Sequence, residues 1–138
     1  MTTQYRETVR NARLDQVDTL VGTAGSLRIY TGAQPADCTA ANSGTLLSHI
    51  VLPNPAFAAA ATGAMAKNGT WQDASADGGA AGTPGHYRIY NSQATMDGTT
   101  CVVQGSCGIG SGDINFDGTI TAGQQVTINT FTLTEGNP

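Results

Sequence analysis

The sequence predicts an all-β sandwich preceded by one N-terminal α-helix. Its 138 residues include 18 glycines and five prolines, a composition typical of many turns between short strands. Short runs rich in β-branched and aromatic residues follow one another after residue 22, whereas residues 5–21 contain neither glycine nor proline. We therefore expect a helix or arm over residues 1–22 and a β-sandwich over residues 23–138, together forming a single domain.

The helix is expected over residues 5–21, with Thr3 as its N-cap and Gly22 as its stop. It presents an apolar, an acidic and a basic face, and Leu14 and Val17 lie off the apolar one. The members of the three faces are, in that order, Tyr5, Val9, Ala12 and Leu20; Glu7, Asp15 and Asp18; and Arg6, Arg10 and Arg13.

The basic face has two interpretations. The three arginines form either an ordinary solvated helix face or a docking edge for an acidic partner protein, since the rest of the chain is poor in bases. On the second interpretation, the candidate interface residues are Tyr5, Arg6, Arg10 and Arg13.

Seven later segments have the composition of strands. The stretches around the third one, AAAATGA and ADGGAAG, are expected to be loops. In the last segment the inward-facing parity changes between Ile128 and Phe131, which predicts a β-bulge or a strand that crosses between two partners. The seven segments are residues 26–31, 45–52, 64–73, 86–91, 99–104, 113–121 and 125–134.

One repeat is visible, because the triplet Arg-Ile-Tyr at residues 28–30 recurs at residues 88–90. A sandwich of two similar sheets would produce such a repeat, as would chance similarity between two strands of one β domain. The flanking matches are Gly25 with Gly85 and Asp37 with Asp97.

Charge argues against several partners. The net charge is −4, charged residues make up only 12% of the chain, and no basic residue follows Arg88, so a nucleic-acid surface is not expected. No run approaches the roughly 20 apolar residues of a membrane span, and no signal peptide is recognisable, so we expect synthesis and retention in the cytoplasm. A polar but uncharged surface suits a wide contact with another protein.

Motifs for catalysis or metal binding are weak. Cys38, Cys101 and Cys107 are expected to be small buried residues, because their spacing does not suit zinc. The segment DINFDG at residues 113–118 begins like a calcium loop, but the twelfth position is Gln124 and apolar residues alternate, so a strand is expected instead.

Catalytic machinery is not expected either. His49 and His86 lie in predicted strands without a local Ser, Cys or carboxylate partner, and no nucleophile elbow or phosphate loop is present. We therefore assign no catalytic residue, metal ligand or cofactor and expect a protein that is not an enzyme, while a small hydrolase with dispersed catalytic residues stays an alternative.

Five segments together resemble a family of small virion proteins of tailed phages, the capsid decoration or cement proteins. They are YRETVRNARLDQVDTLVG, GSLRIYTGAQPADC, LPNPAF, GTPGHYRIYNS and DINFDGTITAGQQVTINTFTLTEGN. The resemblance covers nearly the whole chain, although no single motif in it is specific.

The resemblance implies a jelly-roll-like β-sandwich that forms homodimers on the outer surface of a virion, binds the major capsid protein and bridges neighbouring capsomers. It carries no catalytic residues over to this chain. The alternative is a phage tail or fibre-tip protein that binds a host or a glycan, which would require exposed aromatic side chains among the eight present.

Overall fold

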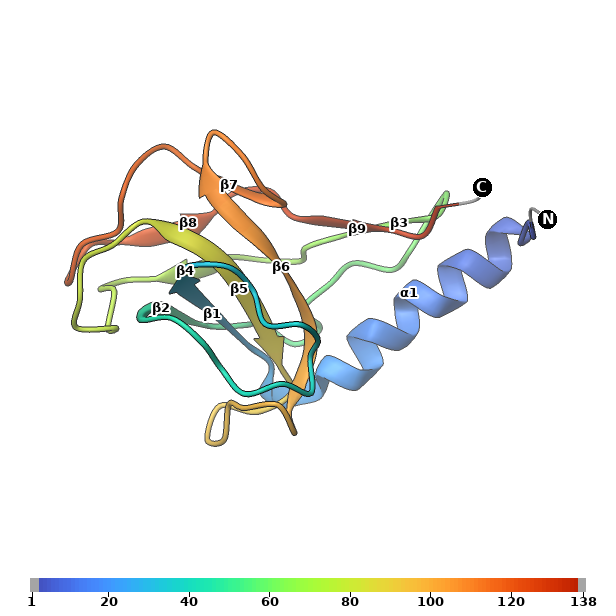
Figure 1. Ribbon diagram of the computed structural model, residues 1–138. Coiled ribbons are helices and arrows are strands. Elements are labelled where there is room, and N and C mark those ends of the chain that lie inside the picture. Colours follow the sequence, from blue (N-terminus) through green and yellow to red (C-terminus); the bar gives the residue numbers. More distant parts are fainter. Residues whose placement is uncertain (1–2, 137–138) are drawn as a thin grey trace.

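The computed structural model describes residues 3–136, and that part of the chain is mostly β with one N-terminal α-helix (Figure 1). The helix α1 spans Glu7–Val21 and is followed by a short 3-10 turn at Gly22–Ala24. The prediction of a β-rich fold with one N-terminal helix is confirmed at this level.

The main sheet has five strands in the order β2-β1-β5-β6-β7. The first four pair antiparallel, whereas β7 runs parallel to β6 after a connection of only residues 110–113. The Asp113 carboxylate accepts hydrogen bonds from the Ser106 backbone N–H (2.9 Å) and hydroxyl (3.2 Å), which anchors this tight connection. The strands are β1 (Ser26–Thr31), β2 (Leu46–Val51), β5 (Pro84–Tyr90), β6 (Cys101–Ile109) and β7 (Ile114–Phe116).

Two short antiparallel pairs complete the β structure, β3 with β9 and β4 with β8. In β4 and β8 the first and third residues are buried and the middle one is exposed, the alternation of a strand with one face on the core. The four strands are β3 (Ala64–Ala66), β4 (Trp71–Asp73), β8 (Val126–Ile128) and β9 (Thr132–Thr134).

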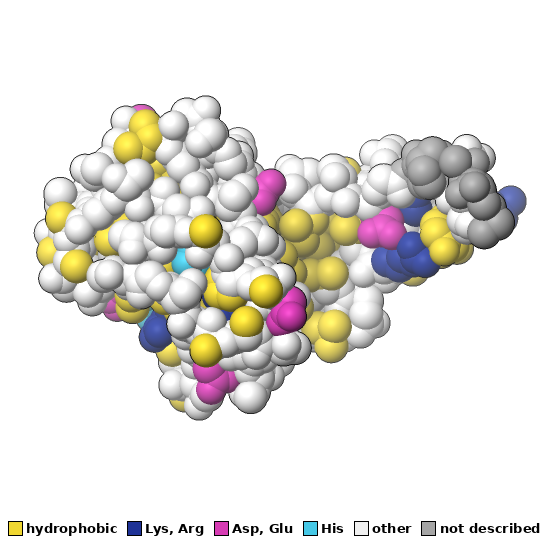
Figure 2. All heavy atoms as spheres, viewed as in Figure 1, with side chains coloured by type: hydrophobic (Ala, Val, Ile, Leu, Met, Phe, Trp, Pro, Cys, Tyr) yellow, Lys and Arg dark blue, Asp and Glu magenta, His cyan; other side chains and the backbone are white. Residues whose placement is uncertain are grey.

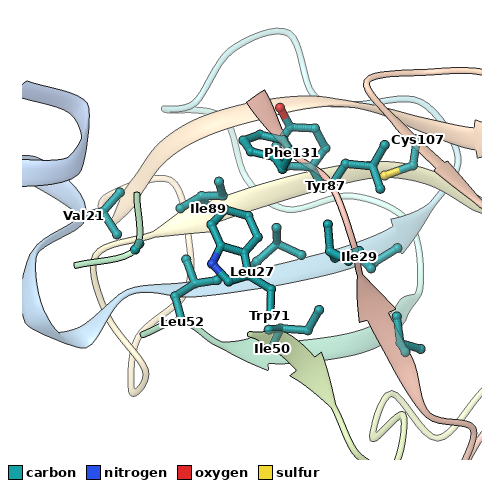
Figure 3. Packing of buried hydrophobic residues seen from close by; sticks show 14 of the residues in the cluster. Val21, Leu27, Ile29, Ile50, Leu52, Trp71, Tyr87, Ile89, Cys107 and Phe131 are labelled. Atoms are coloured by element: carbon teal, nitrogen blue, oxygen red, sulfur yellow. The ribbon is translucent and has the colours of Figure 1, made fainter. Parts of the chain in front are cut away.

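Side chains from all three sheets meet in one core (Figure 3). Fully buried Trp71 lies at its centre, with ring centroids 5.3 Å from both Phe57 and Phe131. Tyr87 from β5 meets Phe131 edge-on, also at 5.3 Å. Tilted and edge-to-face aromatic pairs are favourable beyond the area that they bury, so this cluster joins the short pairs to the main sheet.

The repeated Arg-Ile-Tyr strands lie side by side in one sheet. β1 pairs with β5 antiparallel, and Arg28 lies opposite Arg88. The prediction that the repeat reflects two similar sheets is therefore wrong. Like patterns suit adjacent strands because paired residues point to the same face: Leu27 opposite Ile89 contributes to the core on one face, and the two arginines lie on the other.

The repeated aspartates form two similar turns. Asp37 Oδ1 accepts hydrogen bonds from the backbone N–H (2.8 Å) and hydroxyl (2.6 Å) of Thr39, and Asp97 Oδ1 does the same with Thr99 at 2.7 and 2.6 Å. These hydrogen bonds lower the pKa of both carboxyl groups, with the threonine hydroxyl as the largest cause. The repeat thus extends from the strands to the turns beyond them.

The helix boundaries differ slightly from the prediction. Arg6, not Thr3, precedes the first helical residue, and it makes no side-chain cap. Gly22 ends the helix as expected: its φ of 67° lies in the left-handed region that favours glycine, and its N–H donates to the Asp18 carbonyl.

Two predicted strands are each divided in two. Residues 64–73 form β3 and β4, separated by a turn at Gly69, where φ is 63°. Residues 125–134 form β8 and β9, which pair with β4 and β3 respectively. The change of parity before Phe131 therefore marks the point where the chain changes its partner strand. This is the second of the two predicted explanations, a strand that crosses between two partners.

The remaining strand predictions hold with shifted bounds. Residues 26–31 match β1, and β2 and β5 begin or end within two residues of their predictions. β6 continues to Ile109, beyond the predicted end, whereas the 113–121 strand is shorter than predicted because only Ile114–Phe116 pairs with β6. Ile120 instead forms an isolated bridge with Gly82.

Candidate protein interface on the N-terminal arm

Three segments project together from the rest of the molecule (Figure 1). They are α1, the hairpin of residues 57–67 that contains β3, and β9; we call them the arm and the remainder the body. Figure 2 shows the arm as a lobe beside the body, with hydrophobic side chains on its surface.

Residues 58–64 of the hairpin were predicted to be a loop, and residues 58–63 form no named strand, although Ala61 makes an isolated bridge with Ala64. Ala61 and Ala64 exchange two backbone hydrogen bonds of 2.9 Å around a two-residue turn. Thr62 (φ 53°) and Gly63 (φ 74°) both have positive φ, the conformation that two-residue hairpin turns with the twist of their strands adopt. The flanking alanines are too small to show an alternating pattern, so only the Thr-Gly pair signals this turn.

Polar side chains attach α1 to the hairpin edge. They are spaced three or four residues apart and so lie on one helix face. Each accepts a hydrogen bond from a backbone N–H of residues 57–63, groups that would otherwise remain unpaired at a strand edge. The contacts are Glu7 with Thr62 (3.2 Å), Asn11 with Gly63 (2.8 Å), Asp15 with Ala60 (2.7 Å) and Asp18 with Phe57 (3.0 Å).

Two of the candidate arginines bind Glu135, the residue that follows β9. Arg13 Nη1 lies 2.7 Å from a carboxylate oxygen of Glu135, and Arg10 Nη1 donates to the Glu135 carbonyl at 3.1 Å. The Arg13 guanidinium also lies 4.0 Å from the centroid of the Tyr5 ring. Glu135 and then Tyr5 raise the pKa of Arg13. The structure thus brings three of the four candidate residues together around Glu135, which sequence reasoning missed.

Arg6 does not belong to this cluster. Its backbone carbonyl accepts hydrogen bonds from the N–H groups of Val9 (2.9 Å) and Arg10 (3.2 Å), and its side chain is exposed. Of the predicted docking edge, Arg6 therefore presents its charge to solvent, while Arg10 and Arg13 hold the arm together.

The apolar helix face is directed outward. Val9 is 42% exposed, Leu20 is 54% exposed, and Tyr5, at the start of the same face, is 37% exposed. A surface helix usually turns its apolar stripe toward the core, but here Leu14 and Val21, outside that stripe, are the buried residues. In this orientation the acidic face meets the hairpin edge, while Leu14, Val21 and half-buried Val17 face the core.

The outer face of the main sheet carries a buried polar layer. The Arg88 guanidinium, fully buried, donates to the carbonyls of Cys38 (2.7 Å) and Ala40 (3.1 Å) and to Asn42 Oδ1 (2.6 Å). The Tyr90 hydroxyl donates to the same Asn42 oxygen at 2.8 Å. These hydrogen bonds hold the 32–45 loop over the sheet, so the role of the polar layer is structural.

Both histidines lie in strands, as predicted. His86 Nδ1 donates to the Gly32 carbonyl (2.9 Å), and its ring stacks on Tyr30 with centroids 5.1 Å apart. Burial lowers the pKa of His86 and of His49, and the charge of Arg28 contributes further at His49. Within residues 3–136, neither imidazole hydrogen-bonds a Ser, Cys or carboxylate side chain.

Cys101 and Cys107 lie on β6, and Cys38 lies in the 32–45 loop. Cys101 and Cys107 are separated by about 20 Å of extended strand, far beyond the reach of a disulfide. The Cys101 thiol donates to the Val103 carbonyl at 3.6 Å, and burial and then interaction with Cys38 raise its pKa. Burial is the main cause that raises the pKa of both Cys101 and Cys107 to about 12. All three are free thiols.

The calcium-like segment forms a strand, which confirms the prediction for Ile114–Phe116. Two of its three potential ligand side chains have protein partners, because Asp113 binds Ser106 and Asn115 Oδ1 accepts from the Gly110 N–H at 2.7 Å. In the part of the chain that the structure describes, no three His, Cys, Asp or Glu side chains group so as to hold a metal ion.

Comparisons with protein-family models, curated proteins and solved structures give no match to this chain. No helix within residues 3–136 combines the length and the apolar character needed to cross a membrane.

Proposed function

We propose that this chain is a structural virion protein that decorates the outer capsid surface of a tailed bacteriophage and cements neighbouring capsomers. The observation that carries the proposal is the outward apolar face of α1, with Val9 42% and Leu20 54% exposed on a projecting arm. Apolar side chains and arginine are typical of protein interfaces, and exposed Arg6 lies three residues before Val9.

The attachment of the arm supports this role. Four side-chain-to-backbone hydrogen bonds and the Arg13–Glu135 ion pair hold α1 in place before any partner binds. A preorganised element loses little conformational entropy on docking, so even a small contact contributes to binding. Many such contacts repeated over a shell favour the assembled state by mass action.

The proposed partners are the major capsid protein and a second copy of this chain. The proposed fold is a jelly-roll-like sandwich, and the curled five-stranded sheet closed by two short pairs over one core supports it. The resemblance to decoration proteins described above points in the same direction.

The first test is the copy number of this protein in purified virions relative to the major capsid protein. Near-stoichiometric amounts are expected on a decorated shell, measured by quantitative mass spectrometry. A handful of copies would favour the alternative, a tail or fibre-tip protein, and complete absence from the virion would contradict both.

A second test locates the interface. Leu20→Asp on the arm and Val51→Asp on β2 are a matched pair, because both side chains are 54% exposed. Leu20→Asp is expected to lower the occupancy of shells assembled from the major capsid protein at least about tenfold, since it places a charge in an apolar contact. Val51→Asp is expected to leave occupancy unchanged, and equal effects of the two variants would refute an interface on the arm.

Arg6→Glu tests the charged edge of the same surface. Its side chain is exposed and outside the Glu135 cluster, so the change leaves the attachment of the arm intact. Charge reversal at Arg10 and Arg13 would also break the contacts with Glu135. A loss of binding in such variants could then not be separated from a loss of folded structure. Unchanged binding of Arg6→Glu at low salt would show that the arginine does not meet an acidic partner.

A further inference from the structure

Three adjoining hollows meet at Phe116, the last residue of β7. Their volumes are 410, 400 and 250 Å³, and Phe116 lines all three. The largest lies between β7, the turn that follows it and β8, and its volume falls within the roughly 300–1,000 Å³ of small-ligand sites.

The lining combines one aromatic ring with polar groups, one of which is a carboxylate. Phe116 is half-buried, with part of its ring against the core. Around the ring stand amide, hydroxyl and carboxylate side chains, all exposed: Asn115, Asp117, Gln124, Gln125, Thr127 and Asn129.

Some of these polar groups are fixed and others are available. Gln124 Oε1 accepts from the N–H (3.0 Å) and hydroxyl (3.1 Å) of Thr121, which positions the amide and leaves its N–H₂ group for another partner. The side chains of Asp117, Gln125 and Asn129 make no hydrogen bond with any residue from 3 to 136. Their hydrogen-bonding capacity is therefore directed to the hollow or to solvent.

The charge of the site selects against most ligand classes. Asp117 is its one carboxylate and no basic side chain lines any of the three hollows, so phosphate, sulfate and other anions are disfavoured. The lining is also too polar for an apolar ligand. Amides and a carboxylate next to an aromatic ring suit a neutral polyhydroxylated ligand, because each sugar hydroxyl donates one hydrogen bond and accepts others.

The frame around the ring is preorganised. Phe116 lies opposite Ile109 in the parallel β6–β7 pair, and its carbonyl accepts from the Gly110 N–H at 3.2 Å. Ile120, beyond the turn, exchanges hydrogen bonds of 2.9 and 3.0 Å with Gly82. A ring held by backbone pairing on both sides offers its free surface without first having to be ordered.

We infer that the hollow at Phe116 binds a neutral saccharide, with a pyranose stacked on the Phe116 ring and its hydroxyls bound by Asp117, Gln125 and Asn129. The C–H groups of one sugar face contact the electron-rich face of the Phe116 ring, while the side chains around the ring form hydrogen bonds with the sugar hydroxyls. This inference is independent of the shell-binding role, because its residues lie outside the arm.

The test is an NMR titration of the ¹⁵N-labelled full chain with the methyl glycosides of glucose, galactose, mannose, rhamnose and N-acetylglucosamine. Each is added to about 20 mM, which detects dissociation constants up to the millimolar range. At least one glycoside is expected to shift amide signals of residues 115–129. Asp117→Asn and Asn129→Ala are each expected to weaken that binding about tenfold or more.

Two variants sharpen the test. Phe116→Leu retains an apolar side chain against the core but removes the stacking surface, and it is expected to lose binding while the spectrum remains that of a folded protein. Gln34→Ala, an exposed amide outside the hollows, is the matched control and is expected to bind as the unaltered chain does. The inference is overturned if none of the five glycosides shifts these signals, or if Asp117→Asn and Asn129→Ala bind undiminished.

Discussion

The body and the arm are held together by different forces. In the body, apolar side chains from three sheets pack around fully buried Trp71. In the arm, helix side chains such as Asp15 and Asp18 bind backbone N–H groups of the hairpin, in addition to the apolar contacts of Leu14 with the core. With its acidic face on the hairpin edge and Leu14 and Val21 in the core, α1 leaves the face with Val9 and Leu20 free to meet a partner.

The difference teaches that an exposed apolar stripe need not indicate a misplaced helix. Burial of the stripe would have left the N–H groups of Phe57, Ala60 and Gly63 at an open edge, and an unpaired buried N–H costs about as much as a lost hydrogen bond. The helix orientation that satisfies this edge is also the one that displays Val9 and Leu20.

The largest expected effect is in the body. Trp71→Ala should lower the free energy of unfolding by about 3–5 kcal/mol, because it empties the centre of the aromatic cluster. Urea denaturation followed by circular dichroism measures it. Gln72→Ala, the exposed neighbour in the same strand, should stay within about 0.5 kcal/mol. Similar losses in both variants would mean that the core does not dominate the stability of the body.

A smaller and local effect is expected in the arm. Asp15→Ala with Asp18→Ala removes the acceptors of the Ala60 and Phe57 N–H groups and should cost about 1–3 kcal/mol by analogy with lost helix caps. Amide hydrogen exchange should speed up in the hairpin while β1 and β5 keep their protection. Gln16→Ala on the same helix is the control. Exchange that speeds up evenly over the whole chain would refute a separate mode of attachment.

Acid should weaken the body through its histidines. Burial lowers the pKa of folded His86 and His49 below the value of about 6.5 that an unfolded histidine has. The unfolded chain therefore binds more protons than the folded chain. As a result, the free energy of unfolding has its full value above pH 6.5 and falls as the pH drops below 6.5.

Denaturation at pH 7 and pH 5 measures this dependence. His86→Asn, whose amide can still donate to Gly32, should reduce the loss of stability between the two pH values. An unchanged loss in that variant would assign the effect to other groups.

The smallest effect concerns the thiols. With their pKa raised to about 12, Cys101 and Cys107 should react slowly with iodoacetamide at pH 8 in the folded protein and rapidly in urea. Any intramolecular disulfide formed in the folded chain should join Cys38 to Cys101, as peptide mapping by mass spectrometry can show. A Cys101–Cys107 disulfide in folded protein would contradict the extended geometry of β6.

The elements were largely predictable from the sequence, whereas the site was only partly so. β1 was found at its true bounds because its composition and its closing glycine are local signals. The role of Glu135 was not predictable, since it lies 122 residues from Arg13 and no local pattern links them. The hollow at Phe116 was missed for the same reason, because separate segments of the chain shape it.

The contact between Arg13 and Glu135 has a consequence for folding. It joins the first helix to the last strand, so the arm requires nearly the whole chain before its final contacts can form. Closing so long a loop is slow compared with forming the antiparallel pairs of the main sheet, whose partners are nearer in sequence. On a ribosome, α1 can therefore meet the hairpin of residues 57–67 well before Glu135 is made, and the contacts of Arg10 and Arg13 with Glu135 form among the last.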